Sequence, residues 1–169
     1  GMNMREVFSR SIGKLQSTVL SSLLADSQFF AGLAIDIMDR NLYERSCDVR
    51  WWATDSAVVG VLQQGTDEAR AYACERLATI LRSYTVYLDL WVADRNGRVV
   101  ATGRGNKFPA AIGQDVSETE WFKSGMRTKN GDDFAVCDIT RNSTLGNAQV
   151  ATYSTAIRKG GSVDGEALG

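Results

Sequence analysis

The side chains that could carry out chemistry in this sequence are limited first by the absence of histidine. Serine–histidine and cysteine–histidine catalysis, histidine zinc signatures and histidine-ligated haem all need an imidazole, so these classes of site are excluded. No other nucleophile stands at a recognisable spacing from a base. We therefore expect a protein that is not an enzyme and that holds no metal or cofactor.

The three cysteines, Cys47, Cys74 and Cys137, are odd in number, widely spaced and outside any Cys-x-x-Cys arrangement. This pattern argues against a disulfide-stapled scaffold and against a structural zinc site. The simplest interpretation is three small buried hydrophobic residues. A disulfide between Cys47 and Cys74 stays open, because it requires their two segments to pack together.

Two further groups of residues resemble functional motifs only superficially. The glycine-rich segment 103–105 lacks the Gly-x-x-x-x-Gly-Lys-Ser/Thr pattern of a phosphate-binding loop. The carboxylate pairs Asp132–Asp133 and Glu118/Glu120 lack the apolar surroundings that would raise one pKa for acid–base work. We interpret them as solvated acids in turns.

Length and charge narrow the class of protein further. A chain of 169 residues is enough for one domain of ordinary size. Nineteen lysines and arginines against 20 acidic residues give a net charge of −1, which favours neither nucleic acid nor anionic lipid as a partner. The most apolar window, from 19 to 38, is interrupted by Asp26, Gln28 and Asp36, so no membrane span is expected.

The first half of the chain, residues 1–83, has the periodicity of helices. Apolar residues recur at spacings of three, four and seven between Leu20 and Ile37, and the pattern continues without proline to Leu62. Thr66 then caps a second helix that runs to about Arg82. Two interpretations are equally open: a long helix that pairs with a second copy of the chain, or two successive helices folded back on a sheet.

The second half, residues 84–169, has the pattern of strands and turns. Alternating apolar residues predict a strand over 86–92 that turns at Asn96–Gly97 into a return strand over 98–102. Ser117 and Glu120 form a capping box that opens a short helix to about 127. Two more strands are predicted over 134–139 and 150–157.

This order of elements predicts one α+β domain, with a long N-terminal helix packed on a four-stranded antiparallel sheet. A fifth strand after Gly169 would complete a common arrangement, so we expect the sequence to end where that strand would begin.

Three segments in this order carry a resemblance to a known family: 90–102, with its Asp-x-x-Gly-x-Val-x-Ala hairpin, 112–117, with Gly-x-Asp-Val-Ser, and 120–122, with Trp-Phe. In these segments the sequence resembles the Cache (PAS-like) sensor domains of bacterial methyl-accepting chemotaxis proteins and other signal-transduction proteins. The resemblance covers about residues 20–169. It implies a PAS-like sheet, a small-molecule ligand and no catalysis.

The resemblance also implies a ligand site. Amino-acid-binding members are similar to this chain at Trp121, at Phe122 and at Asp138, whose counterpart holds the ligand's amino group. The arginine that holds the ligand's carboxylate in those members, two residues before the tryptophan, is replaced here by Thr119.

Further candidates for ligand contacts come from charge and from position in the strands. Arg104, Lys107 or Lys123 could supply the missing positive charge, and Tyr153 could contact the ligand from the last strand. Each candidate also has an ordinary structural interpretation, because aromatic residues of a short helix or a sheet pack in cores. The ligand expected is an amino acid, an organic acid or an amine.

The function expected from these observations is the sensing of a small solute, relayed by displacement of the long helix to an output signalling domain. A homodimer through the long helix is the expected assembly. The alternatives are a PAS- or GAF-like domain that holds haem or flavin, and a dimerisation module without a ligand. The start at Met2 and the unpaired cysteines favour a cytoplasmic sensor, with a periplasmic domain of a membrane receptor as the alternative.

Overall fold

The computed structural model describes residue 4, residue 28 and residues 40–169, and the chain divides into two units, 1–44 and 45–169. The elements and the site below belong to the second unit. The predicted apolar stripe from Leu20 to Ile37 lies outside the described residues, and with it the N-terminal part of the helix through which a homodimer was expected.

The helical pattern predicted to run unbroken to Leu62 is interrupted at residues 53–55, so that prediction was wrong. The preceding helical turn closes where the Thr54 hydroxyl donates to the carbonyl of Trp51 at 2.6 Å. The Asp55 carboxylate then accepts from the amide of Ala57 at 2.9 Å and begins helix α2, Ser56–Gln64. Local side-chain bonds to the backbone therefore overrode the apolar periodicity.

Helix α3, Asp67–Ser83, confirms the second predicted helix. Thr66 caps it, since its hydroxyl accepts from the amide of Ala69 at 3.1 Å. Asp67 and Glu68 stand at its positive end, where negative charge is favourable. Its inner face buries Ala73 and Leu77.

The predicted hairpin is present, but its first strand is shorter than the alternation suggested. Strand β1, Trp91–Ala93, pairs antiparallel with β2, Val99–Thr102. The turn uses a positive φ of 80° at Gly97 alone, with Asn96 outside that region. Residues 86–90, predicted to be the first part of this strand, are irregular.

Helix α4, Glu120–Met126, is the predicted short helix, but its cap differs from the prediction. Thr119, and not Ser117, accepts from the amide of Phe122, at 3.4 Å. The Thr119 hydroxyl also donates to the carbonyl of Val116, at 2.6 Å. Because Val116 is buried, this hydrogen bond fixes the segment before α4 to the core.

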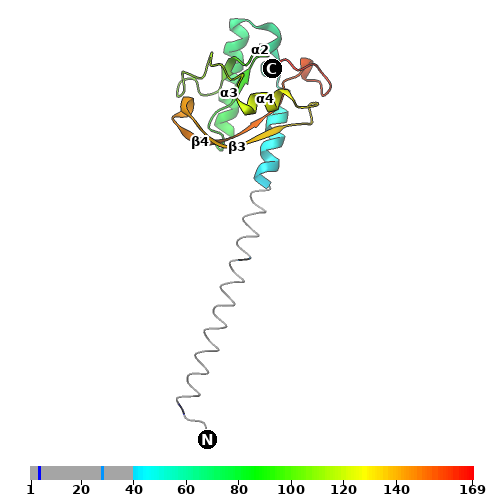
Figure 1. Ribbon diagram of the computed structural model, residues 1–169. Helices are drawn as coiled ribbons and strands as arrows, with labels where there is room; N and C mark the ends of the chain where they lie inside the picture. Colours follow the sequence, from blue (N-terminus) through cyan, green and yellow to red (C-terminus); the bar gives the residue numbers. More distant parts are fainter. Residues whose placement is uncertain (1–3, 5–27, 29–39) are drawn as a thin grey trace. The chain divides into compact units, whose positions relative to one another are not determined.

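The last strands form a second hairpin beneath α4 (Figure 1). β3, Ala135–Asn142, pairs antiparallel with β4, Ala148–Ser154, and a bulge interrupts the register between Cys137 and Thr140. A short 3-10 turn connects them, and another, Lys159–Gly161, follows β4. The two hairpins do not pair with each other, so the single four-stranded sheet predicted from the sequence is replaced by two small sheets.

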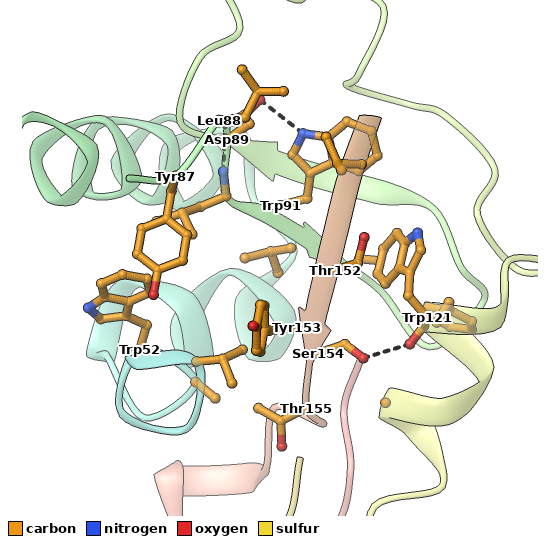
Figure 2. Close-up of a pocket in the computed structure, with 18 of the residues that line it drawn as sticks. Trp52, Tyr87, Leu88, Asp89, Trp91, Trp121, Thr152, Tyr153, Ser154 and Thr155 are labelled. Atoms are coloured by element: carbon orange, nitrogen blue, oxygen red, sulfur yellow. Dashed lines mark hydrogen bonds between the residues drawn. The ribbon is translucent and has the colours of Figure 1, made fainter. Parts of the chain in front are cut away.

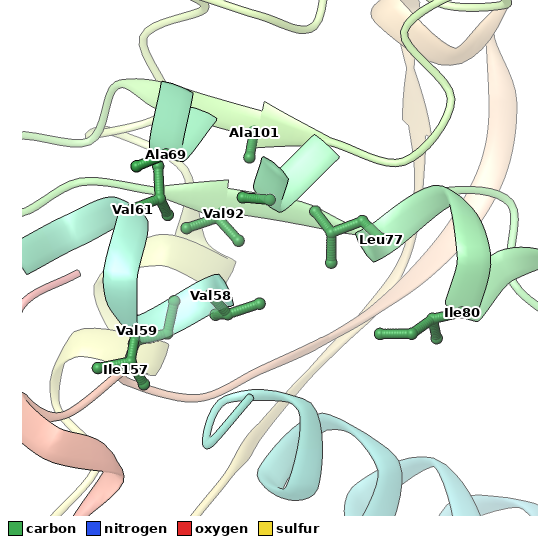
Figure 3. Packing of buried hydrophobic residues seen from close by; sticks show 10 residues of the cluster. Val58, Val59, Val61, Ala69, Leu77, Ile80, Val92, Ala101 and Ile157 are labelled. Atoms are coloured by element: carbon green, nitrogen blue, oxygen red, sulfur yellow. The ribbon is translucent and has the colours of Figure 1, made fainter. Parts of the chain in front are cut away.

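The main core lies where α2 and α3 cover one face of the first hairpin (Figure 3). Val92 of β1 packs there with Val58 and Leu77. Burying a side chain of this size contributes about 2 kcal/mol to the free energy of unfolding. The opposite face of β1 and β2 forms a second, smaller cluster that includes Ala93 and Val99.

Candidate functional site

A cavity of about 480 Å³ lies between the two hairpins (Figure 2). It is bounded by residues 86–93, by β4 and by α4, and the helical segment 45–52 and α2 also reach it. Its size lies within the range of clefts that bind small molecules.

On the side of α4, aromatic rings form the wall of the cavity. The rings of Trp91 and Trp121 meet edge to face, with centroids 6.3 Å apart, and Trp121 meets Phe122 in the same way at 6.2 Å. Thr152 and Ser154 of β4 point toward this wall in Figure 2. The Ser154 hydroxyl donates to the carbonyl of Trp121 at 2.8 Å, which ties α4 to β4. We call this region the α4 half of the cavity.

On the other side, a second aromatic group surrounds Tyr87. Its ring meets Trp52 edge to face at 5.0 Å, and the guanidinium of Arg45 lies 5.0 Å from its centroid. The Tyr87 hydroxyl donates to the carboxylate of Asp48 at 2.6 Å. Burial, followed by this bond to Asp48, raises the pKa of Tyr87 far above its usual value. The phenol therefore stays protonated and fixed in place.

Asp89 lines the cavity, but its carboxylate is fully used within the chain. It accepts from the Trp91 indole at 2.9 Å and from the Thr102 hydroxyl at 2.7 Å. It also accepts from three backbone amides, those of Leu90, Gly103 and Arg104. These bonds draw the start of β1 onto the end of β2 and explain why residues 84–90 do not continue the strand.

Three of the six predicted ligand residues line the cavity: Trp121, Phe122 and Tyr153. The first two lie together in the α4 half. Tyr153 leaves the opposite face of β4, on the side of Trp52 (Figure 2). The sequence therefore predicted residues from both sides of the cavity, but it did not indicate that they lie on different sides.

The other three predicted residues, Asp138, Arg104 and Lys123, do not line this cavity. Asp138 is exposed at the bulge of β3. Lys123 is paired with Glu118 at 2.9 Å on the surface of α4. Arg104 lies in the loop after β2, where its amide donates to Asp89.

Sequence reasoning missed several lining residues, above all Trp91, Tyr87 and Met126. Trp91 was visible as a large residue at an alternating position of the predicted strand. A further signal for the cavity was that aromatic residues recur through 84–91, a segment that begins well before strand β1. Trp52 packs on Tyr84 and Tyr87, whereas its neighbour Trp51 is 67% exposed.

The three cysteines are free thiols and are half-buried. Burial, with the negative charges of Glu120 and Asp138, raises the pKa of Cys137. A thiol of this kind is a poor nucleophile.

Within residues 40–169, no group of histidine, cysteine, aspartate and glutamate side chains could hold a metal ion. No helix in the same described part of the chain is both long and apolar enough to cross a membrane. In the comparisons with known proteins, no family model matches the chain and no curated protein matches it either.

Proposed function

We propose that this protein is a ligand-sensing module of the Cache type, in which a small organic solute binds in the α4 half of the cavity. The observation that carries the proposal is the aromatic wall of Trp91, Trp121 and Phe122 facing the hydroxyls of Thr152 and Ser154. An apolar wall with a few polar groups opposite is the usual composition of a small-molecule site.

The charges around the cavity bear on the kind of solute. Two charged residues, Arg45 and Asp89, line the cavity, and both already have partners within the chain. Arg45 forms an ion pair with Asp48 at 3.5 Å. Asp89 accepts hydrogen bonds from five donors. The polar groups left on the α4 side are neutral ones, such as the hydroxyl of Thr152. This favours a solute held by aromatic packing and hydroxyl contacts over one held by an ion pair.

The same cavity supports a route for the signal. Arg45, Val49 and Trp52 of the helical segment 45–52 line it. A solute that binds the module with different affinity in two positions of this segment would shift their populations. In this proposal, the displacement passes to an output domain of a signal-transduction protein such as a chemoreceptor.

The test is a thermal-shift screen against amino acids, organic acids, amines and neutral aromatic solutes. A true ligand at one hundred times its Kd adds about 2.7 kcal/mol to the free energy of unfolding. Trp121→Ala should abolish the shift, whereas Trp51→Ala, which removes an exposed indole outside the cavity, should leave it unchanged. A shift that survives Trp121→Ala would overturn the proposed site.

Two other results would overturn the function itself. An absorbance band above about 350 nm in the purified protein would show a bound cofactor and favour the haem or flavin alternative. No shift with any member of the library would favour a dimerisation module without a ligand.

A further inference from the structure

Asn142, the last residue of β3, is a polar residue that lines the cavity and has no part in the proposed function so far. It pairs with Ala148 of β4. Residues opposite each other in an antiparallel pair have their side chains on the same face, and side chains alternate along a strand. Asn142 therefore shares the face of Thr152 and Ser154, which is the face turned toward Trp121 in Figure 2.

The turn that follows β3 fixes the orientation of the Asn142 carboxamide. Its Oδ1 accepts from the amide of Thr144 at 3.0 Å and begins the short 3-10 turn Ser143–Leu145. The Thr144 hydroxyl donates to the carboxamide oxygen of Gln114 at 2.7 Å. The carbonyl of Gln114 accepts in turn from the amide of Val99 in β2, at 3.0 Å. This chain of bonds connects the Asn142 side chain to the first hairpin and holds it in one orientation.

The group that Asn142 has left for a solute is a hydrogen-bond donor. Among residues 40–169, the bond to Thr144 is the only hydrogen bond of its side chain, and that bond uses the oxygen. The Nδ2 atom, which can only donate, remains. A neutral donor favours a neutral acceptor such as a carbonyl oxygen. A carboxylate would lose its hydration here without gaining an opposite charge, and an ammonium group offers no acceptor.

The distance along β4 indicates the length of the solute. Ala148, opposite Asn142, and Thr152, which points toward the aromatic wall, are about 13 Å apart at the rise of an extended strand. Val150 lies between them on the same face, and Leu145 lines the cavity from the turn. A solute that reaches from the aromatic wall to Asn142 therefore needs an apolar middle and one polar end.

We propose that the solute is an uncharged, elongated molecule with a ring against Trp121 and Phe122 and a carbonyl group that accepts a hydrogen bond from Nδ2 of Asn142. A carboxamide is the simplest end group of this kind. The amino acids, organic acids and amines expected from the sequence differ from this class in carrying a charge. The inference rests on the proposed function, because it names the class of solute for the same site.

The test compares three solutes that share a phenyl ring and a chain of the same length: 4-phenylbutanamide, 4-phenylbutanoate and 4-phenylbutylamine. Calorimetric titration at pH 7 measures their Kd values, with the second solute as an anion and the third as a cation. We expect the amide to bind at least tenfold more tightly than either charged solute. Equal Kd values for the three would overturn the proposed class.

Asn142→Asp reverses the polarity of the donor with almost no change of shape. Aspartate caps a turn as well as asparagine does, so the bond from the Thr144 amide is kept. We expect this variant to bind the amide at least tenfold more weakly and the amine at least tenfold more tightly than the unaltered protein. The gain for the amine keeps the test independent of folding, because an unfolded variant would lose affinity for every solute.

Asn147→Asp is the matched control. It introduces the same charge in the same hairpin, at an exposed residue that does not line the cavity. Asn147 has φ of 59°, a conformation that aspartate also tolerates. The control should leave all three Kd values unchanged. The same Kd values in the two aspartate variants would show that Asn142 does not contact the solute.

The two proposals fail in different ways. If Trp121→Ala abolishes binding of a solute and Asn142→Asp does not change it, the role of Asn142 is wrong and the aromatic site stands. The solute class is also wrong if none of the three solutes binds while other members of the library shift the melting temperature. If no solute of any class binds to the unaltered protein, the sensing function itself fails.

Discussion

The indole Nε1 of Trp91 donates a hydrogen bond to Oδ2 of Asp89 at 2.9 Å, and the same oxygen accepts from the hydroxyl of Thr102 at 2.7 Å. One carboxylate oxygen therefore fixes both a ring of the aromatic wall and the end of β2. The position of the candidate site depends on this acid, although the acid itself has no acceptor left for a solute.

Replacing the acid should therefore cost stability even though it is not a ligand contact. Asp89→Asn presents an amide to donors that need an acceptor, and we expect the free energy of unfolding to fall by about 2 kcal/mol. Urea denaturation measures this loss. Asp164→Asn, on an exposed loop, is the matched control and should change the value by less than about 0.5 kcal/mol. Equal effects of the two substitutions would show that the Asp89 bonds contribute little.

Two glycines with nearly the same positive φ allow the cost of backbone strain to be distinguished from the cost of steric crowding. Gly97 has φ of 80° and Gly113 has φ of 82°. A Cβ at Gly97 would come within 2.6 Å of the Ser117 Cα, whereas one at Gly113 would meet nothing within 4 Å. We expect Gly113→Ala to cost about 1 kcal/mol from backbone strain, and Gly97→Ala to cost a further ~1–3 kcal/mol from overpacking. Thermal unfolding of both variants checks the difference; similar losses would contradict the close approach to Ser117.

The buried phenol of Tyr87 predicts a loss of stability at alkaline pH. Its folded pKa lies above the ordinary value of 10.0, so folding favours the protonated phenol. This contribution is complete below pH 10 and is lost as the pH rises above it, because the unfolded state then releases a proton that the folded state retains. The slope is at most about 1.36 kcal/mol per pH unit.

The measurement is urea denaturation at pH 9, 10 and 11. Tyr87→Phe should remove this part of the slope, although its stability below pH 9 falls with the loss of the bond to Asp48. Tyr72→Phe, at a site that is 55% exposed, should keep the slope of the unaltered protein. An unchanged slope in Tyr87→Phe would sink the explanation.

The turn that follows β4 depends on the buried guanidinium of Arg158. Its two terminal nitrogens donate to the carbonyls of Thr128 at 2.7 Å and Gly165 at 3.0 Å. Arg158→Lys loses the planar fork that reaches both acceptors, and we expect a loss of about 2 kcal/mol. Arg127→Lys, at an exposed pair with Glu120, should cost no more than about 1 kcal/mol. Denaturation that ranks the two variants in the opposite order would contradict this role.

The elements predicted best from the sequence are those whose signals are local and agree with one another. Helix α3 has a threonine cap, two acids in its first turn and an apolar face, and all three point to the same bounds. The first hairpin has Gly97 where the turn needs a positive φ. In both cases a residue's own conformational preference decides the structure.

The errors occurred where two local choices competed. The helix predicted to reach Leu62 ends because the Asp55 carboxylate bonds a backbone amide. Ser117 and Thr119 both carry a hydroxyl suited to capping, and Thr119 takes the role since it also bonds the buried Val116. Such competitions depend on burial, which the sequence alone does not reveal.

The candidate site was predictable only in its aromatic part. Trp121 and Phe122 lie in the cavity because the helix that follows Thr119 turns them inward. Asp138 was expected to face a ligand from mid-strand, but it lies at a register shift and is exposed. A bulge changes which way a residue faces, and it leaves no clear mark in the residues around it.

The bulge in β3 also affects the behaviour of the protein in concentrated solution. Ile139 is 68% exposed and Val136 is 44% exposed, so this strand carries apolar side chains into water. A flat edge strand with exposed apolar side chains is a template for intermolecular β-aggregation. The irregular register at residues 137–140 interrupts the flat edge, and the charges of Asp138 and Arg141 lie beside it. Because the irregularity at Asp138 interrupts the ladder on this edge, we expect a substitution that straightened β3 to lower the solubility of the folded protein, measured as the concentration at which it precipitates.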